Sequence, residues 1–124
     1  MITTAITPQL IVHTASDETG LVQVTAAMQF WYGHPDFDPD RPVLWDMRAA
    51  TDTLPDEDVE AWSESNSSQI NERRPGCKTA WVFPNSTAAE FAVDVLGAHD
   101  WRHKVRIFNN DIEAARAWLL STIR

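Results

Sequence analysis

The chain has 124 residues, of which 44% are hydrophobic, and this size suits one globular domain over residues 1–124 with one continuous core. Its 18 acidic and 10 basic residues give a formal net charge of -8 at pH 7. A surface that follows a nucleic-acid backbone would have to form against this overall field, so the composition argues against a nucleic-acid partner.

The first expected elements are a strand and a helix. Leu, Ile, Val and Thr gather in Gln9–Ser16, a run too short for a stable helix, and this composition predicts a strand. In the next segment, 21–33, the alternation of Val22 and Val24 with polar residues favours a strand, but apolar residues also recur at helical spacing. Because Gly33 stands where a helix would end, we prefer the helix.

A connection, a second strand and a second helix come next. Residues 34–42 hold three prolines and three aspartates, which cannot continue a regular element and therefore predict a surface connection. Residues 43–47 have the composition of a buried strand. Thr53 and Asp56 then form a capping pattern, which predicts a helix from about 54 to 74. Few apolar residues mark its inner face, so we expect this helix to be lightly docked.

The second half of the chain repeats this order. Residues 78–83 and 104–108 are the third and fourth expected strands. A helix follows each of them, the first capped by Ser86 and the second by Asn110. Strand and helix thus alternate four times, which predicts an α/β fold with a mainly parallel sheet and right-handed crossovers.

Polar residues stand at the ends of these strands, where open α/β sheets tend to bind ligands. Asp46 and Arg48 end the second strand, and Pro84, Asn85 and Asn109 follow the later ones. Asp46 could act as a base or anchor a ligand. However, an aspartate at a strand end commonly accepts backbone N–H groups or pairs with an arginine, and no His, Ser or Lys is placed to complete a catalytic set. The structural role is therefore the preferred interpretation.

The sequence gives no metal or cofactor site. His99 and His103 have a spacing that can bind metal on one helical face, but they lie between a helix and a strand, where solvated loop histidines are expected. Cys77 has cationic neighbours but no evident base, which favours a structural cysteine. Four glycines form no phosphate-binding loop, so nucleotide binding of the usual kinds is not expected.

The expected compartment is the cytoplasm. A single cysteine cannot form an intramolecular disulfide. The first residues lack a basic flank with a long apolar run, and no segment approaches the roughly 20 apolar residues that span a bilayer.

Two stretches, "HPDFDPDRPVLWDMRAA" (34–50) and "VRIFNNDIEAARAWL" (105–119), resemble the bacterial SpoIIAA-like family. This family consists of small proteins with the STAS fold, related to the CRAL-TRIO lipid-transfer domains. The resemblance spans nearly the whole chain after Gln9 and favours a helix at 21–33. It implies a sheet of four strands, or five if an N-terminal edge strand pairs with the strand before the first helix. Here only "ITTAI" (2–6) is available for that edge, so both four and five strands remain open.

The resemblance also implies a phosphorylation switch. STAS domains that antagonise anti-sigma factors carry a phosphorylatable serine, within an Asp-Ser-Ser-Gly type pattern, at the start of the helix after the strand that corresponds to 43–47. This sequence has "AATDTLPDED" there, so Thr51 or Thr53 could substitute. The acidic run would repel an added phosphate, which argues against the switch.

We expect a regulatory or protein-interaction module without catalytic activity, which recognises a protein partner through one sheet edge and the helix after Asp46. The candidate interaction surface consists of Asp46, Arg48, Thr51, Thr53, Pro84 and Asn85. A homodimer is also expected, because an edge strand left without "ITTAI" would be exposed and prone to pairing. The alternative is a small-molecule or lipid carrier, which the relationship to CRAL-TRIO domains implies and for which six tryptophans could line an apolar pocket. An enzyme that uses Asp46, Cys77 or His99 is the third hypothesis.

Overall fold

The computed structural model describes residues 1–17, 20–50, 61–62, 64–66, 70, 77–84 and 104–121. Its strands and helices, in chain order, are β1 (Ile2–Ile6), β2 (Ile11–Asp17), α1 (Leu21–Tyr32), β3 (Val43–Ala50), β4 (Lys78–Phe83), β5 (Lys104–Asn109) and α4 (Ile112–Leu119). Residues 61–62, 64–66 and 70 are helical as well. The described residues therefore form an α/β structure, as the sequence predicts.

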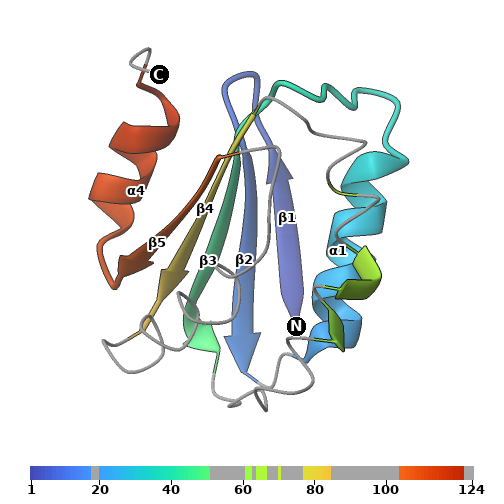
Figure 1. The fold of residues 1–124 in the computed structure, drawn as a ribbon, viewed down its shortest axis with the longest axis horizontal. Helices are drawn as coiled ribbons and strands as arrows, with labels where there is room; N and C mark the ends of the chain where they lie inside the picture. Colours follow the sequence, from blue (N-terminus) through green and yellow to red (C-terminus); the bar gives the residue numbers. More distant parts are fainter. Residues whose placement is uncertain are drawn as a thin grey trace.

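The strands form one five-stranded mixed sheet in the order β1-β2-β3-β4-β5. β1 pairs with β2 antiparallel, and the other three pairs are parallel, so the prediction of a mainly parallel sheet is confirmed (Figure 1). The "ITTAI" segment is a complete strand, so of the two strand counts left open by the sequence the structure has five. The short connection after Ile6 allows only a hairpin, and the Thr7 hydroxyl closes this turn by donating to the Leu10 carbonyl at 2.8 Å.

The ambiguous segment after Gly20 is a helix, as preferred from the sequence. Its polar positions could have faced solvent in a strand, so local propensity alone left the choice open. Packing decides it, because a helix brings Val24, Met28 and Trp31 onto one buried face against the sheet.

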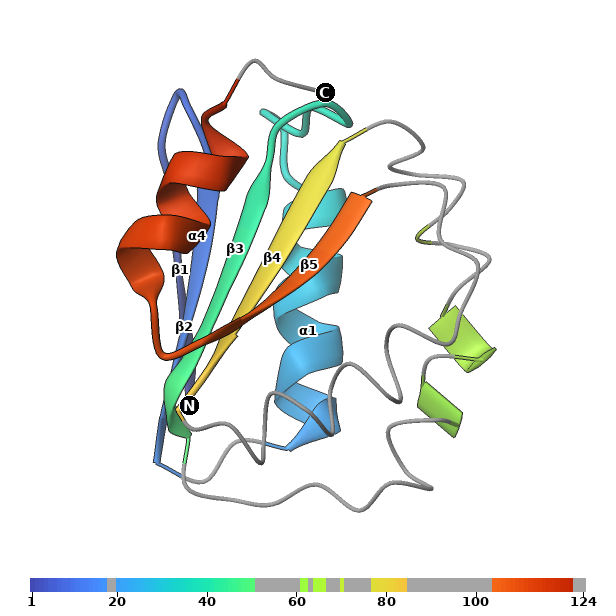
Figure 2. The same cartoon turned by 60° about the vertical axis from the view of Figure 1, so that its left-hand side comes forward.

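The two described helices cover opposite faces of the sheet, which we call the α1 face and the α4 face (Figure 2). β3 shows the alternation that this requires, because Trp45 belongs to the core under α1 and Leu44 to the core under α4. The larger core lies on the α1 face and consists of Ile11, Ala15, Val24, Ala27, Met28, Trp31, Tyr32, Val43, Trp45, Met47, Ile70 and Trp81. The α4 core consists of Leu10, Leu44, Ala80, Val82, Ala115 and Leu119.

The last helix begins one residue later than its predicted cap. Asp111, rather than Asn110, caps α4, and its carboxylate accepts from the Ala114 backbone N–H at 3.0 Å. Asn110 adopts a left-handed conformation with a φ of 55°, which asparagine tolerates better than most residues. Its N–H donates to the Phe83 carbonyl at 2.7 Å, so it links the end of β5 to β4 instead of opening the helix.

The helix predicted from about 54 to 74 is described only in part. Ile70 is buried in the α1 core, and the Trp62 indole N–H donates to the Thr25 hydroxyl at 2.7 Å, so this piece packs beside α1. The Thr53 cap and the helix expected after Ser86 lie outside the described residues. Neither described helix has the length and apolar character needed to span a membrane.

Candidate functional site

Asp46 and Arg48 form a tight pair on β3. The Arg48 Nε donates to Asp46 Oδ1 at 2.9 Å, and Arg48 Nη2 donates to Oδ2 at 2.9 Å. The Arg48 backbone N–H also donates to Oδ1, at 3.2 Å. Both contacts foreseen for a structural aspartate, to a following backbone N–H and to an arginine, are present.

The pair lies inside β3 and not at its end, which corrects the prediction that Asp46 ends the strand. Asp46 is in register with Thr14 of β2, whereas Ala49 is in register with Ser16, so the parallel pairing contains a bulge. One extra β3 residue is accommodated there. The bulge returns Ala50 to the α1 face, where it packs against the core, and the Asp46 carboxylate takes up the Arg48 N–H beside it.

Electrostatics keep the Asp46 carboxylate ionised. The hydrogen bonds from the Arg48 guanidinium lower the pKa of Asp46, partial burial opposes them, and the charge of Arg116 on α4 adds to the lowering. The Asp46 side chain is 13% exposed and that of Arg48 38%. A carboxylate with a lowered pKa and three N–H donors is a weak base, so this arrangement anchors the bulge.

The remaining candidate residues are only partly described. Pro84 directly follows β4 and is half-buried, and Asn109 ends β5, so both lie at carboxyl ends of parallel strands as expected. Thr51, Thr53 and Asn85 lie outside the described residues, as do His99 and His103. The sequence did not point to Arg116, which the fold brings toward Asp46 from 70 residues further along the chain.

Cys77 is buried just before β4, in agreement with a structural cysteine. In the described part of the chain, no three His, Cys, Asp or Glu side chains come together in a way that could hold a metal ion.

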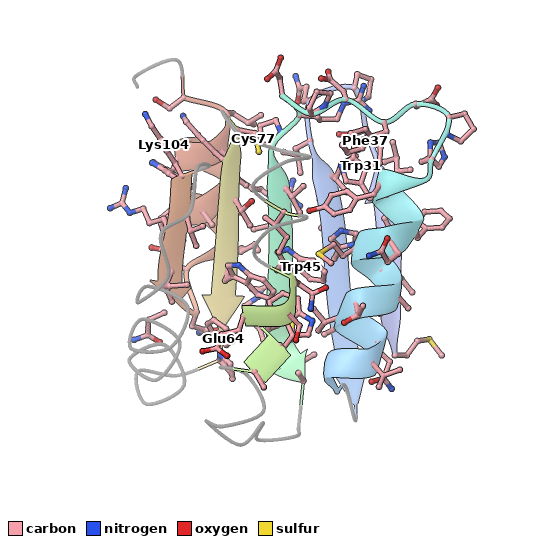
Figure 3. The ribbon with its side chains drawn as sticks, turned by 45° about the vertical axis from the view of Figure 1, so that its right-hand side comes forward. Trp31, Phe37, Trp45, Glu64, Cys77 and Lys104 are labelled. Carbon is pink, nitrogen blue, oxygen red and sulfur yellow. The ribbon has the colours of Figure 1, made fainter. Side chains whose placement is uncertain are left out.

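A row of side chains crosses the α1 face through all five strands. Its members, paired in register, are Thr4, His13, Trp45, Trp81 and Ile107. The Trp45 and Trp81 rings stack with centroids 4.7 Å apart, and the His13 ring lies 4.1 Å from that of Trp45. Figure 3 shows Trp45 on the face of the sheet that α1 covers. His13 is 1% exposed, and its Nδ1 is 2.8 Å from the Thr4 hydroxyl. The row is thus close-packed core that joins the β1 edge to the rest of the sheet.

On the side of β1 away from β2, backbone groups have no partner strand among the described residues. Met1 and Ser16 exchange both backbone hydrogen bonds, each at 2.8 Å, and the Thr7 N–H donates to Leu10 at 3.1 Å. Hydrogen-bonded and non-hydrogen-bonded pairs alternate in an antiparallel ladder, so Thr3 and Ala5 also bond to β2. The N–H and C=O groups of Ile2, Thr4 and Ile6 therefore point away from the sheet, along its open side.

Exposed apolar side chains occur at the start of β1 and on the helix that packs against it. Met1 is exposed at its start, and Phe30 of α1 is 54% exposed although it is a large aromatic residue. α1 packs over β1, so both belong to the same side of the molecule. Residues 1–16 contain no Asp, Glu, Lys or Arg, and this uncharged start in a chain of net charge -8 is the sequence signal that could have identified the edge.

Comparison of the chain with protein-family models, with curated proteins and with solved structures gave no match.

Proposed function

We propose that this chain is a regulatory or protein-interaction module without catalytic activity, and that its docking surface is the β1 edge with the adjoining flank of α1. The observation that carries this proposal is the outward-facing backbone of Ile2, Thr4 and Ile6, together with the exposed Phe30 of α1, the helix that packs against β1. Extended segments of partner proteins commonly add to such an edge, because the backbone supplies hydrogen bonds and nearby apolar side chains supply contact area.

The chemistry of Asp46 supports a non-catalytic role. Its carboxylate is engaged by Arg48 through both oxygens, and its pKa is lowered, whereas a general base at neutral pH needs a raised one. The pair holds the bulge of β3 in place, and this accounts for both residues without a reaction.

The arrangement of β1 supports the resemblance to the SpoIIAA-like family. That resemblance implies an N-terminal edge strand paired with the strand before the first helix, and β1 pairs with β2 immediately before α1. We propose a STAS-type domain on this ground, with partner recognition as its role.

Photo-cross-linking in cells that produce the protein naturally tests this function. A photo-reactive phenylalanine analogue at position 30 reports on the proposed surface, and the same analogue at Ala117, exposed on α4, is the matched control. We expect a discrete protein adduct, with another protein or a second copy, from position 30 only. Equal labelling from both positions, or no protein adduct from either, contradicts the proposal.

One observation favours the alternative, an apolar small-molecule or lipid carrier. The Trp31 indole N–H is buried and has no hydrogen-bond partner among the described residues, so an acceptor on a bound molecule would satisfy it. Native mass spectrometry of freshly purified protein tests this. An added mass that denaturation removes, and that is lost in Trp31→Phe, supports a carrier, and a bare chain mass contradicts it.

A further inference from the structure

We infer that the partner of the β1 edge is a second copy of this chain, which pairs antiparallel with β1 about a two-fold axis through Thr4. The inference rests on the proposed function of this edge as a docking surface. It adds the identity of the partner and the register of pairing.

The outward backbone groups of β1 are symmetric about Thr4. Ile2 and Ile6 lie two residues to either side, and all three residues direct N–H and C=O groups outward. A two-fold axis at Thr4 therefore pairs Thr4 with Thr4 of the second copy, and Ile2 with Ile6. Each such pair exchanges two hydrogen bonds, so the two five-stranded sheets become continuous.

The side chains of β1 also match their own copy. The strand reads Ile-Thr-Thr-Ala-Ile, so the paired residues on the α1 face are isoleucine with isoleucine and threonine with threonine. On the other face, Thr3 lies opposite Ala5 of the second copy, and both side chains are exposed. Each copy has a net charge of -8, but residues 1–16 contain no Asp, Glu, Lys or Arg. Charged side chains of the two strands therefore do not repel each other where the strands pair.

The flank of α1 extends the contact. Thr25 faces Trp62, whose helical piece lies on the β3–β4 side of α1 (Figure 3). Phe30 follows Thr25 by five residues, so at about 100° per residue it lies roughly 140° away around the helix, on the flank toward the open edge. A two-fold axis perpendicular to the sheet leaves both α1 helices on one face, side by side, and the exposed Phe30 ring then packs against the helix of the second copy.

Cysteine cross-linking tests this register. Thr3 and Ala5 of the second copy form a non-hydrogen-bonded pair with Cα atoms about 4.5 Å apart, within the range of a disulfide. We expect a mixture of Thr3→Cys and Ala5→Cys chains to form covalent dimers under mild oxidation, while either variant alone forms none. The buried Cys77 is present in every sample and sets the background. Cross-linking of one single variant with itself overturns the inference, because it reports a different register.

Paired charges give a second test. Thr3→Lys with Ala5→Lys places like charges opposite each other at two positions, whereas Thr3→Glu with Ala5→Lys places opposite charges there. Sedimentation should show the dimer dissociation constant at least about tenfold higher for the all-lysine variant than for the mixed one. Equal constants overturn the inference.

The two proposals fail separately. A monomeric wild-type chain at high micromolar concentration overturns the dimer. If position 30 then cross-links to a different protein, the interaction role stands, and if it cross-links to none, that role fails as well.

Discussion

The two end strands of the sheet present different surfaces. β1 exposes uncharged backbone and small side chains, whereas β5 carries the exposed cations Lys104 and Arg106. Figure 3 shows Lys104 on β5, at the edge of the sheet farthest from α1 and β1. The Arg106 guanidinium lies 5.2 Å from the Phe108 ring and 5.9 Å from that of Trp118, which holds it close to α4. Lysine and other charges on an edge strand disfavour pairing with another chain, and their absence permits it. The difference favours β1 over β5 as the edge for the association that we propose.

The largest expected effect comes from the row that joins both edges. Trp45→Ala removes a buried ring that contacts His13 and Trp81, and it should lower the free energy of unfolding by about 3–5 kcal/mol. Chemical denaturation measures this. Because the row supports the whole sheet, association through β1 should be lost together with stability. A variant that dimerises normally while destabilised would contradict this coupling.

The second change lies midway between the edges and should affect stability alone. Arg48→Met leaves the Asp46 carboxylate without its arginine, at a cost of about 1–3 kcal/mol at neutral pH. The pKa of Asp46 is lowered in the folded chain, so the stabilisation is present above the ordinary value of 3.8 and is lost as the pH falls through the folded value. Thermal unfolding of the wild type and the variant should therefore converge at acidic pH.

An Asp46→Asn variant is the control for this pH dependence, because it removes the titrating group. The stability of Asp46→Asn should lack the part of the loss on acidification that the Asp46 carboxylate contributes in the wild type. A wild-type chain that loses no more stability than Asp46→Asn on acidification would contradict the assignment.

The third change acts on association alone. Phe30→Asp places a charge on the flank that meets the second copy and should raise the dimer dissociation constant about tenfold, or ~1.4 kcal/mol. Val22→Asp is the matched control. Val22 is 82% exposed on the same helix, and it lies roughly 60° around the helix from Thr25, which faces away from the proposed interface. Light scattering over a concentration series should show a change within about twofold for Val22→Asp. Equal effects of the two substitutions would show that Phe30 is not part of the interface.

The smallest effect is expected at β5. Arg106→Gln removes the cation from the Phe108 and Trp118 rings and should cost about 0.5–1 kcal/mol of stability. Adding Lys104→Thr removes the second charge of this edge without touching β1. Denaturation measures the loss of stability. Light scattering of the double variant should show weak additional self-association at high concentration. A dimer lost in this double variant would mean that β5, and not β1, is the interface.

Most of the regular structure could be read from the sequence. Residues 78–83 form β4 as predicted, and the Gln9–Ser16 prediction differs from β2 by two residues at its start and one at its end. Both runs are rich in residues that fit a half-buried pleated surface, and this preference is local. The apolar spacing after Gly20 also placed Val24, Met28 and Trp31 on the inner face, where they are buried. Periodicity carried this information because it repeats over several turns.

The site was less accessible from the sequence. A pairing of Asp46 with Arg48 was foreseen because the two are close in the chain, but the bulge that brings the Arg48 N–H to the carboxylate depends on the register with β2. Arg116 acts on Asp46 only because α4 packs across β3. Asp111 caps α4 in place of the predicted Asn110 because the Asn110 N–H donates to the Phe83 carbonyl. That acceptor belongs to the neighbouring strand β4, so the sequence around Asn110 does not reveal it.

The sequence by itself determined the positions of β2, α1, β4, β5 and α4, the inner face of α1 and the lack of charge in residues 1–16, because composition and periodicity are properties of neighbouring residues. Only the tertiary structure decided that "ITTAI" is a full strand and which of its backbone groups remain open. A segment of only five residues gains its stability from pairing with β2 and from the core beneath α1, and these contacts involve residues outside the segment.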